Sequence, residues 1–171
     1  MDIDTLIKNW HEKDPEDYFS GYVFEYLAFI AYLKRKLYTY ENKDRWVIQL
    51  LKRETLLKDR YLSLVSNNPD LQNAWQEIKN ELDKNQLWNI SHNWTSSEED
   101  KWWNCSSVQP SGLTCKGTIR TLDDWENMVE FWYAIRNNLF HGGKDPNDNR
   151  DEFLVEHGYT TLKPFVAILI K

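Results

Sequence analysis

Apolar residues recur at intervals of three and four along most of this chain, and this spacing restricts its fold more than any other feature. The clearest series is Phe19, Val23, Tyr26, Ile30, Leu33 and Leu37. Such intervals match the α-helix, in which each turn takes about 3.6 residues. Six glycines and five prolines are few among 171 residues, so little in the composition interrupts a helix. The pattern therefore predicts an all-α fold.

The same spacing predicts four long helices and a closing one. They cover about 14–40, 43–65, 68–82, 121–141 and 150–170. Asp14 before Pro15 and Asn68 before Pro69 are typical helix starts, and Thr121 has the spacing of a capping box. No strand-hairpin pattern is present. We expect one domain over residues 1–171, an up-and-down bundle of four to five main helices.

The first long helix is apolar on every side, which indicates burial on more than one face, in a core or a subunit interface. Glu25 is its only charged residue between Asp17 and Lys34. Because an arginine on an apolar helix face needs a partner to be tolerated, we expect Glu25 to contact Arg136 of the fourth predicted helix.

Residues 85–120 have no helical period and form a long irregular insertion. A loop of this length in a compact domain is either functional or contains a short element. His92, Cys105 and Cys115 lie in or near it, but they include no C-x2-C pair and no clear fourth zinc ligand. We therefore expect no metal and no cofactor, and we expect the two cysteines to be free thiols.

Charge and targeting features set further bounds. The net charge is −6, so no global basic field favours nucleic acid, yet residues 34–60 carry nine cations against four anions. That stretch is either a solvated helix surface or a face that guides phosphates. The first residues resemble no secretory signal, and no apolar run has membrane length. These features predict a soluble cytoplasmic protein with no membrane partner.

An arginine and a histidine near the end of the fourth predicted helix stand out. On a helical wheel Arg136 falls in the middle of the apolar stripe, whereas Asn137 and His141 fall on the polar side. Asn137 is four residues before His141, so its amide is placed to orient the imidazole. Arg136 and His141 are about 140° apart on a straight helix. The two side chains can therefore act at one site only if the helix end unwinds or if a second copy of the chain supplies one of them.

An ordinary structural explanation also accounts for these residues. A histidine in the last helical turn followed by Gly142 is a common helix end, favoured by the helix dipole. Arg136 and Glu25 would then form a buried ion pair with no further role. Spacing alone leaves both explanations open.

The phrase "IRNNLFHGGK", residues 135–144, resembles the R-x4-6-H motif of the HEPN (higher eukaryotes and prokaryotes nucleotide-binding) superfamily. Arg136 and His141 supply the motif, and the polar Asn137 directly follows the arginine. The helix order is similar too, with long helices first, the motif late, and a closing helix that begins "NRDEFLVEHG". The resemblance is close over 132–155 and loose elsewhere.

The resemblance implies a metal-independent endoribonuclease that acts as a homodimer, with the two motifs meeting at the interface, as in toxins or antiviral defence effectors. His141 would exchange protons with RNA, and Arg136 would bind the developing phosphorane charge. Asn137 would hold the imidazole or a phosphate oxygen, and Asn138 and Lys144 would contact substrate. No metal cluster is required.

Two other functions remain compatible with the sequence. Some HEPN proteins bind nucleotides or partners, such as a nucleotidyltransferase or an antitoxin, without cutting RNA. A purely structural dimerisation domain is the third alternative.

Overall fold

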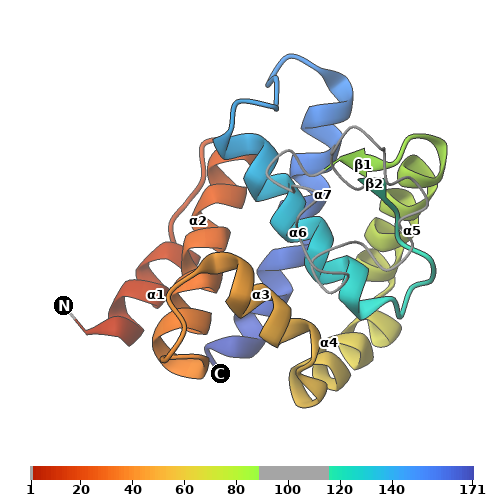
Figure 1. Ribbon diagram of the computed structural model, residues 1–171. Coiled ribbons are helices and arrows are strands. Elements are labelled where there is room, and N and C mark those ends of the chain that lie inside the picture. The colour runs from red at the N-terminus through yellow and green to blue at the C-terminus, as the bar shows by residue number, and fades with distance from the viewer. Residues whose placement is uncertain (1, 89–115) are drawn as a thin grey trace, which may run out of the picture.

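The computed structural model describes residues 2–88 and 116–171, and these are mostly helical (Figure 1). In chain order the elements are α1 (Ile3–His11), α2 (Tyr18–Tyr32), the π-helix η1 (Leu33–Leu37), α3 (Asp44–Lys52), α4 (Thr55–Asn67), α5 (Pro69–Lys84), β1 (Leu87–Trp88), β2 (Lys116–Gly117), α6 (Trp125–Phe140) and α7 (Asn149–Leu169). The predicted all-α class is confirmed. Within the described residues, the departure from this class is the antiparallel pairing of the two-residue strands β1 and β2, which the sequence did not predict.

Helix α7 organises the molecule, because α2, α5 and α6 all pack against it (Figure 1). Aromatic rings fill the space between α6 and α7, and the rings of Trp132 and Phe165 stack there at 5.3 Å. The buried indoles also have hydrogen-bond partners. Trp132 Nε1 donates to Thr161 Oγ1 at 3.0 Å, and Trp75 Nε1 donates to the Tyr61 hydroxyl at 2.9 Å. The chain thus buries several of its tryptophans without leaving those polar edges unpaired.

The N-terminal helices differ from the expectation. The predicted start at Asp14 and Pro15 is wrong, because α2 begins at Tyr18, where Asp17 and Ser20 form a reciprocal capping box. A separate helix, α1, precedes it and begins at the cap residue Asp2. The side-chain cap at Asp17 satisfies two backbone N–H groups, which explains why the chain turns there.

The predicted helix over 43–65 is two helices. The backbone becomes extended at Glu54, whose carboxylate accepts the Leu56 N–H at 3.2 Å and so caps α4. The break lets α3 pack against α6 while α4 packs against α5 and α7. An apolar spacing of three and four continues across it, so the sequence pattern alone did not reveal the interruption.

The later helices are closer to the prediction. Asn68 caps α5 as expected, and α7 continues through both Gly158 and Pro164. The capping box expected at Thr121 is wrong, because α6 begins only at Trp125. The Asp124 carboxylate instead accepts hydrogen bonds from the guanidinium of Arg120. Every helix in the described part of the chain is too short or too polar to cross a lipid bilayer.

Candidate functional site

The C-terminal end of α6 presents Arg136 at the surface between α2 and α3. Its side chain is 27% exposed, so it is neither fully buried nor free in solvent. The guanidinium lies 5.1 Å from the ring centre of Phe140 and 5.9 Å from that of Tyr26. These rings explain how an arginine is tolerated on an apolar stripe, because its flat apolar faces contact aromatic carbon while its N–H edges remain available.

Two oxygen acceptors fix the orientation of Arg136. Nη2 donates to Asp44 Oδ2 at 3.2 Å, and Nη1 donates to Asn137 Oδ1 at 2.9 Å. The expected pair between Arg136 and Glu25 is therefore wrong. Asp44, the first residue of α3, takes that role, and it also accepts from Lys34 Nζ at 3.0 Å.

Glu25 belongs to a separate cluster. Its side chain is only 2% exposed, and its carboxylate accepts from His11 Nδ1 at 2.8 Å, with Lys163 Nζ at 3.9 Å. Burial raises the pKa of Glu25, and His11 partly offsets that effect. The side chains that contact Glu25 thus come from α1 and α7, and not from α6 as predicted.

His141 is the cap residue of α6, and its side chain is exposed. Gly142 N–H donates to Leu139 O at 3.3 Å, and Gly143 N–H donates to Asn138 O at 2.7 Å, which is the hydrogen-bond pattern of a Schellman motif. Gly142 has a φ of 70°. The helix-end explanation of this sequence is thus correct as local structure. Within the described residues the imidazole of His141 has no hydrogen-bond partner, so it is available for chemistry.

Asn137 does not orient His141. Its amide oxygen holds Arg136, and its side chain also hydrogen bonds with Tyr133, whose pKa is raised by burial and partly lowered by that bond. The link between Asn137 and His141 is instead the ordinary helical bond from His141 N–H to Asn137 O at 3.0 Å. Asn137 is therefore a positioning residue for the arginine.

A buried ion cluster lies next to Tyr133. Glu130, with no exposed surface, accepts from Lys52 Nζ at 2.6 Å and from Arg45 Nη1 at 2.9 Å. The Arg45 guanidinium lies 5.1 Å from the ring centre of Tyr133. Two of the cations counted in the basic stretch 34–60 therefore face inward. Sequence reasoning assigned them to the surface because it did not identify their buried partner on α6.

Asn138 and Lys144, which the sequence predicted to contact substrate, both have side chains that are largely buried. Asn138 is buried and donates from Nδ2 to Trp88 O at 2.6 Å, which fastens β1 to α6. The Lys144 side chain is 3% exposed and its ammonium pairs with Asp151. Burial lowers the pKa of Lys144, and Asp151 opposes this. Both residues line a cavity of ≈ 230 Å³ beside the end of α6.

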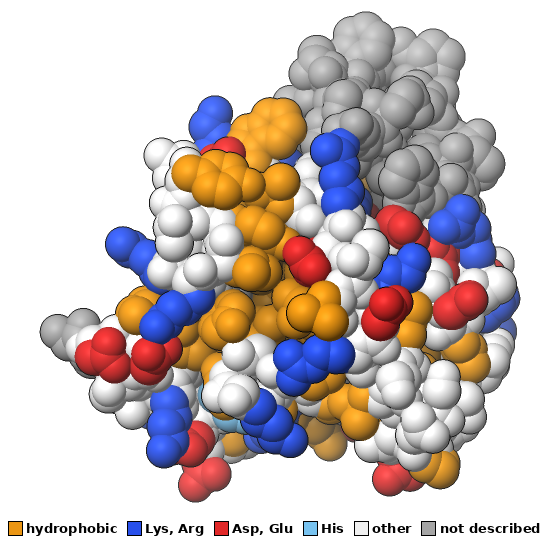
Figure 2. All heavy atoms as spheres, turned by 90° about the horizontal axis from the view of Figure 1, so that it is seen from below, with side chains coloured by type: hydrophobic (Ala, Val, Ile, Leu, Met, Phe, Trp, Pro, Cys, Tyr) orange, Lys and Arg blue, Asp and Glu red, His pale blue; other side chains and the backbone are white. Residues whose placement is uncertain are grey.

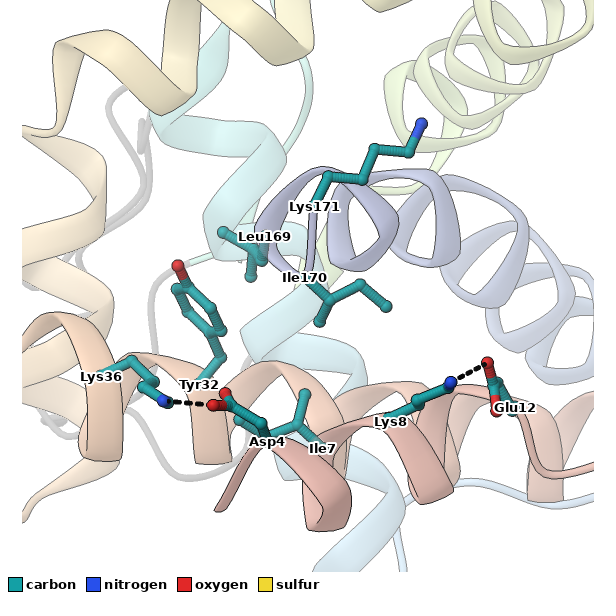
Figure 3. A pocket seen from close by; sticks show the side chains of 9 residues that line it. All are labelled: Asp4, Ile7, Lys8, Glu12, Tyr32, Lys36, Leu169, Ile170 and Lys171. Carbon is teal, nitrogen blue, oxygen red and sulfur yellow. Dashed lines mark hydrogen bonds and ion pairs between the residues drawn. The ribbon is translucent and has the colours of Figure 1, made fainter. Parts of the chain in front are cut away.

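A larger groove of ≈ 510 Å³ lies at the opposite end of the molecule, between α1, the α2–η1 junction and the end of α7 (Figure 3). Ile7, Leu169 and Ile170 form its apolar part. Two ion pairs border it, Lys36 with Asp4 at 2.7 Å and Lys8 with Glu12 at 3.6 Å (Figure 3). The view from below shows hydrophobic side chains gathered in the middle of the lower face, with Lys and Arg side chains around them (Figure 2). None of the motif residues lines this groove.

The described residues contain no group of three or more potential metal ligands. His92, Cys105 and Cys115 lie outside the described residues, as does most of the predicted insertion 85–120. Comparison with models of known protein families, with curated proteins and with solved structures found no match.

Proposed function

We propose that the protein is a metal-independent endoribonuclease of the HEPN type, with a composite site where two copies of the chain bring Arg136 and His141 together. The observation that carries the proposal is the end of α6. It presents a histidine that has no partner among the described residues and, one turn earlier, an arginine that is fixed in place but partly exposed.

Arg136 supports the phosphate-binding part of the proposal. A guanidinium has five N–H donors, and Asp44 and Asn137 occupy one each. No other acceptor in the described chain takes the remaining three. Because two acceptors and two aromatic rings already fix the group, little reorganisation is needed when a phosphate binds, which favours stabilisation of a developing negative charge.

His141 supports the proton-transfer part. The 2′-hydroxyl of RNA gives its proton to an imidazole, and the 2′-oxygen attacks the adjacent phosphorus. The bond from phosphorus to the 5′-oxygen then breaks, and a protonated imidazole gives that oxygen a proton. The products are a 2′,3′-cyclic phosphate and a free 5′-hydroxyl.

A second copy supplies what one chain lacks. Among the described residues, no hydrogen bond, ion pair or ring contact joins Arg136 to His141. Two copies related by a two-fold axis would place the arginine of one near the histidine of the other. Within the family resemblance, a cutting enzyme of this kind fits a toxin or defence effector, and arrest of bacterial growth on expression tests that role.

The experiment is cleavage of single-stranded, structured and transfer RNA by purified protein with EDTA present. We expect cyclic-phosphate ends, and a loss of about 10²-fold or more in His141→Ala, the usual scale for a general acid–base group. Arg136→Lys keeps the charge but not the planar fork, so a folded variant with a large rate loss supports phosphate clamping. Mixing Arg136→Ala with His141→Ala chains should restore activity in mixed dimers.

A non-catalytic nucleotide- or partner-binding module is the second candidate. Its supporting observation is Asp44, which already neutralises Arg136. RNA binding without cleavage of any substrate, or cleavage that needs Mg²⁺ or survives in His141→Ala, would favour this alternative. Light scattering that finds a monomer at high micromolar concentration would overturn the composite site.

A further inference from the structure

The small open cavity beside the end of α6 is lined mainly by polar and charged side chains. Its walls include Gln86, Trp88, Asn138, Lys144 and Arg150, together with Gly143. At ≈ 230 Å³ it is smaller than the roughly 300–1,000 Å³ of sites for drug-sized ligands. This volume suits one planar heterocycle rather than a whole nucleotide.

Lys144 and Arg150 supply hydrogen-bond donors to the cavity, and the Asp151 carboxylate that also lines it accepts from Lys144 and from the Asp145 N–H. The Lys144 ammonium has three N–H donors and donates one of them to Asp151, and the Lys144 side chain is 3% exposed. Arg150 donates from Nε to Glu81 at 2.9 Å and from Nη2 to Asn85 O at 2.5 Å. Its Nη1 has no partner among the described residues. The amide of Gln86, also unpartnered in the described chain, adds one acceptor.

The charges of these cations are already balanced. Asp151 pairs with Lys144, and Glu81 pairs with Arg150. A phosphate would bring negative charge to a site that has no unpaired positive charge to meet it. A neutral ligand with hydrogen-bond acceptors on its edge is the better match. Trp88, which is 43% exposed, supplies an aromatic face for such a ligand to stack on.

We propose that this cavity binds a single unpaired guanine base. The O6 and N7 acceptors of guanine match cationic donors such as Lys144 and Arg150, whereas adenine presents a donor amino group in place of O6. The Gln86 amide oxygen provides an acceptor for the N1–H and N2–H edge. The indole of Trp88 stacks on the ring.

The position of the cavity links it to the proposed ribonuclease, and this role rests on the proposed function. Gly143 lines the cavity and is two residues from His141, so their Cα atoms lie within about 7.6 Å. Asn138 stands on the same last turn of α6 and anchors the Trp88 backbone. A base held here lies next to the nucleotide that His141 would act on, so the cavity selects RNA with an unpaired guanine beside the cut.

Calorimetric titration with guanosine 3′-monophosphate and adenosine 3′-monophosphate tests the cavity without any cleavage. We expect at least about tenfold tighter binding of the guanine nucleotide, on the scale of one well-placed base contact. Trp88→Ala should lose about tenfold in affinity, and Trp88→Phe should recover part of it. Arg150→Lys should reduce the preference for guanine over adenine, because it removes the planar donor edge.

Trp46→Ala is the matched control, since Trp46 is 46% exposed on α3 and does not line the cavity. It should leave both affinities unchanged. Equal binding of the two nucleotides, or guanine binding that is unaffected in both Trp88→Ala and Arg150→Lys, overturns the proposal, with circular dichroism confirming that each variant folds. Guanine binding that persists without RNA cleavage overturns only the ribonuclease proposal. RNA cleavage with no preference for guanine beside the cut overturns only the proposal that this cavity selects guanine.

Discussion

The Arg136 guanidinium donates to the Asp44 carboxylate at 3.2 Å, which joins the end of α6 to the start of α3 across 92 residues of chain. The same carboxylate accepts from Lys34. Asp44 therefore holds two cations in place at the surface. Because it is an anion at the side chain proposed to bind RNA phosphate, it also competes with substrate for Arg136.

The Asp44→Asn variant tests this competition. The side chains of Asp44 and Arg136 are about a quarter exposed, so their ion pair is partly screened, and its loss should lower the free energy of unfolding by no more than about 1 kcal/mol. The affinity for RNA should rise about fivefold, because a repulsive charge is removed from the phosphate site. Fluorescence anisotropy at fixed ionic strength, in the His141→Ala background, measures the change.

Asp59→Asn is the control for the general effect of one less negative charge. Asp59 is exposed on α4 and has no ion pair within the described residues. Asp59→Asn should change the affinity for RNA far less than Asp44→Asn does. Equal effects of the two variants, or weaker binding in Asp44→Asn, would show that Asp44 does not compete with RNA.

Gly142 is required by the backbone that presents His141. Its φ of 70° lies in the left-handed region, and an added Cβ would meet no atom within 4 Å. The penalty for Gly142→Ala is therefore one of backbone conformation, about 1–2 kcal/mol in the free energy of unfolding. Gly142→Asn should be less damaging, because asparagine enters this conformation more easily. Urea denaturation of the three proteins measures this order, and equal stabilities of the Ala and Asn variants would contradict it.

The His11–Glu25 contact should stabilise the attachment of α1. His11→Ala leaves a carboxylate that is 2% exposed without its nearest partner, so we expect a loss of about 1.5–3 kcal/mol in unfolding free energy. His157→Ala is the comparison, because its carboxylate partner Glu77 is half-exposed and can turn to water. Thermal unfolding should rank His11→Ala as the more damaging change. The reverse order would show that Glu25 does not depend on α1.

Local signals in the sequence located those helices whose starts are marked by their own residues. Asn68 before Pro69 correctly predicted the start of α5, because the cap forms within three residues of chain. Asp14 before Pro15 has the same form but does not start a helix, since Asp17 and Ser20 offer a more complete cap a few residues later. A single start motif, taken alone, does not show whether a nearby residue offers a better helix cap.

The sequence drew attention to the residues of the candidate site but did not predict their contacts. Periodicity placed Arg136 on an apolar face and thereby indicated that it needs an anionic partner. Which carboxylate that is depends on how α3 packs against α6, and Asp44 lies 92 positions away. Glu25 was the predicted partner of Arg136 because it is the lone charge in its part of the helix. Isolation along the sequence, however, carries no information on the direction in which a side chain points.

Glu130 offers a prediction on pH, because it is buried between Lys52 and Arg45. Burial alone raises the pKa of Glu130, but the two cations outweigh it and lower the pKa to about 2, from an ordinary value of 4.5. A carboxyl group whose pKa is lower in the folded protein than in the unfolded chain stabilises the fold fully at pH values above its unfolded-state pKa. This stabilisation is lost as the pH falls through the folded-state pKa. Glu130→Gln should therefore lose about 3–5 kcal/mol of unfolding free energy at pH 7, since Lys52 is left as a buried cation.

The gap in stability between wild type and Glu130→Gln should narrow as the pH falls from about 5 toward 2, which urea unfolding across that range measures. The double variant Glu130→Leu/Lys52→Met is the control, because it removes both fully buried charges and leaves Arg45, which reaches solvent. It should unfold within about 1 kcal/mol of wild type or be more stable. A gap that stays constant with pH, or a double variant as unstable as Glu130→Gln, would show that apolar packing at position 130 matters more than the ion pairs.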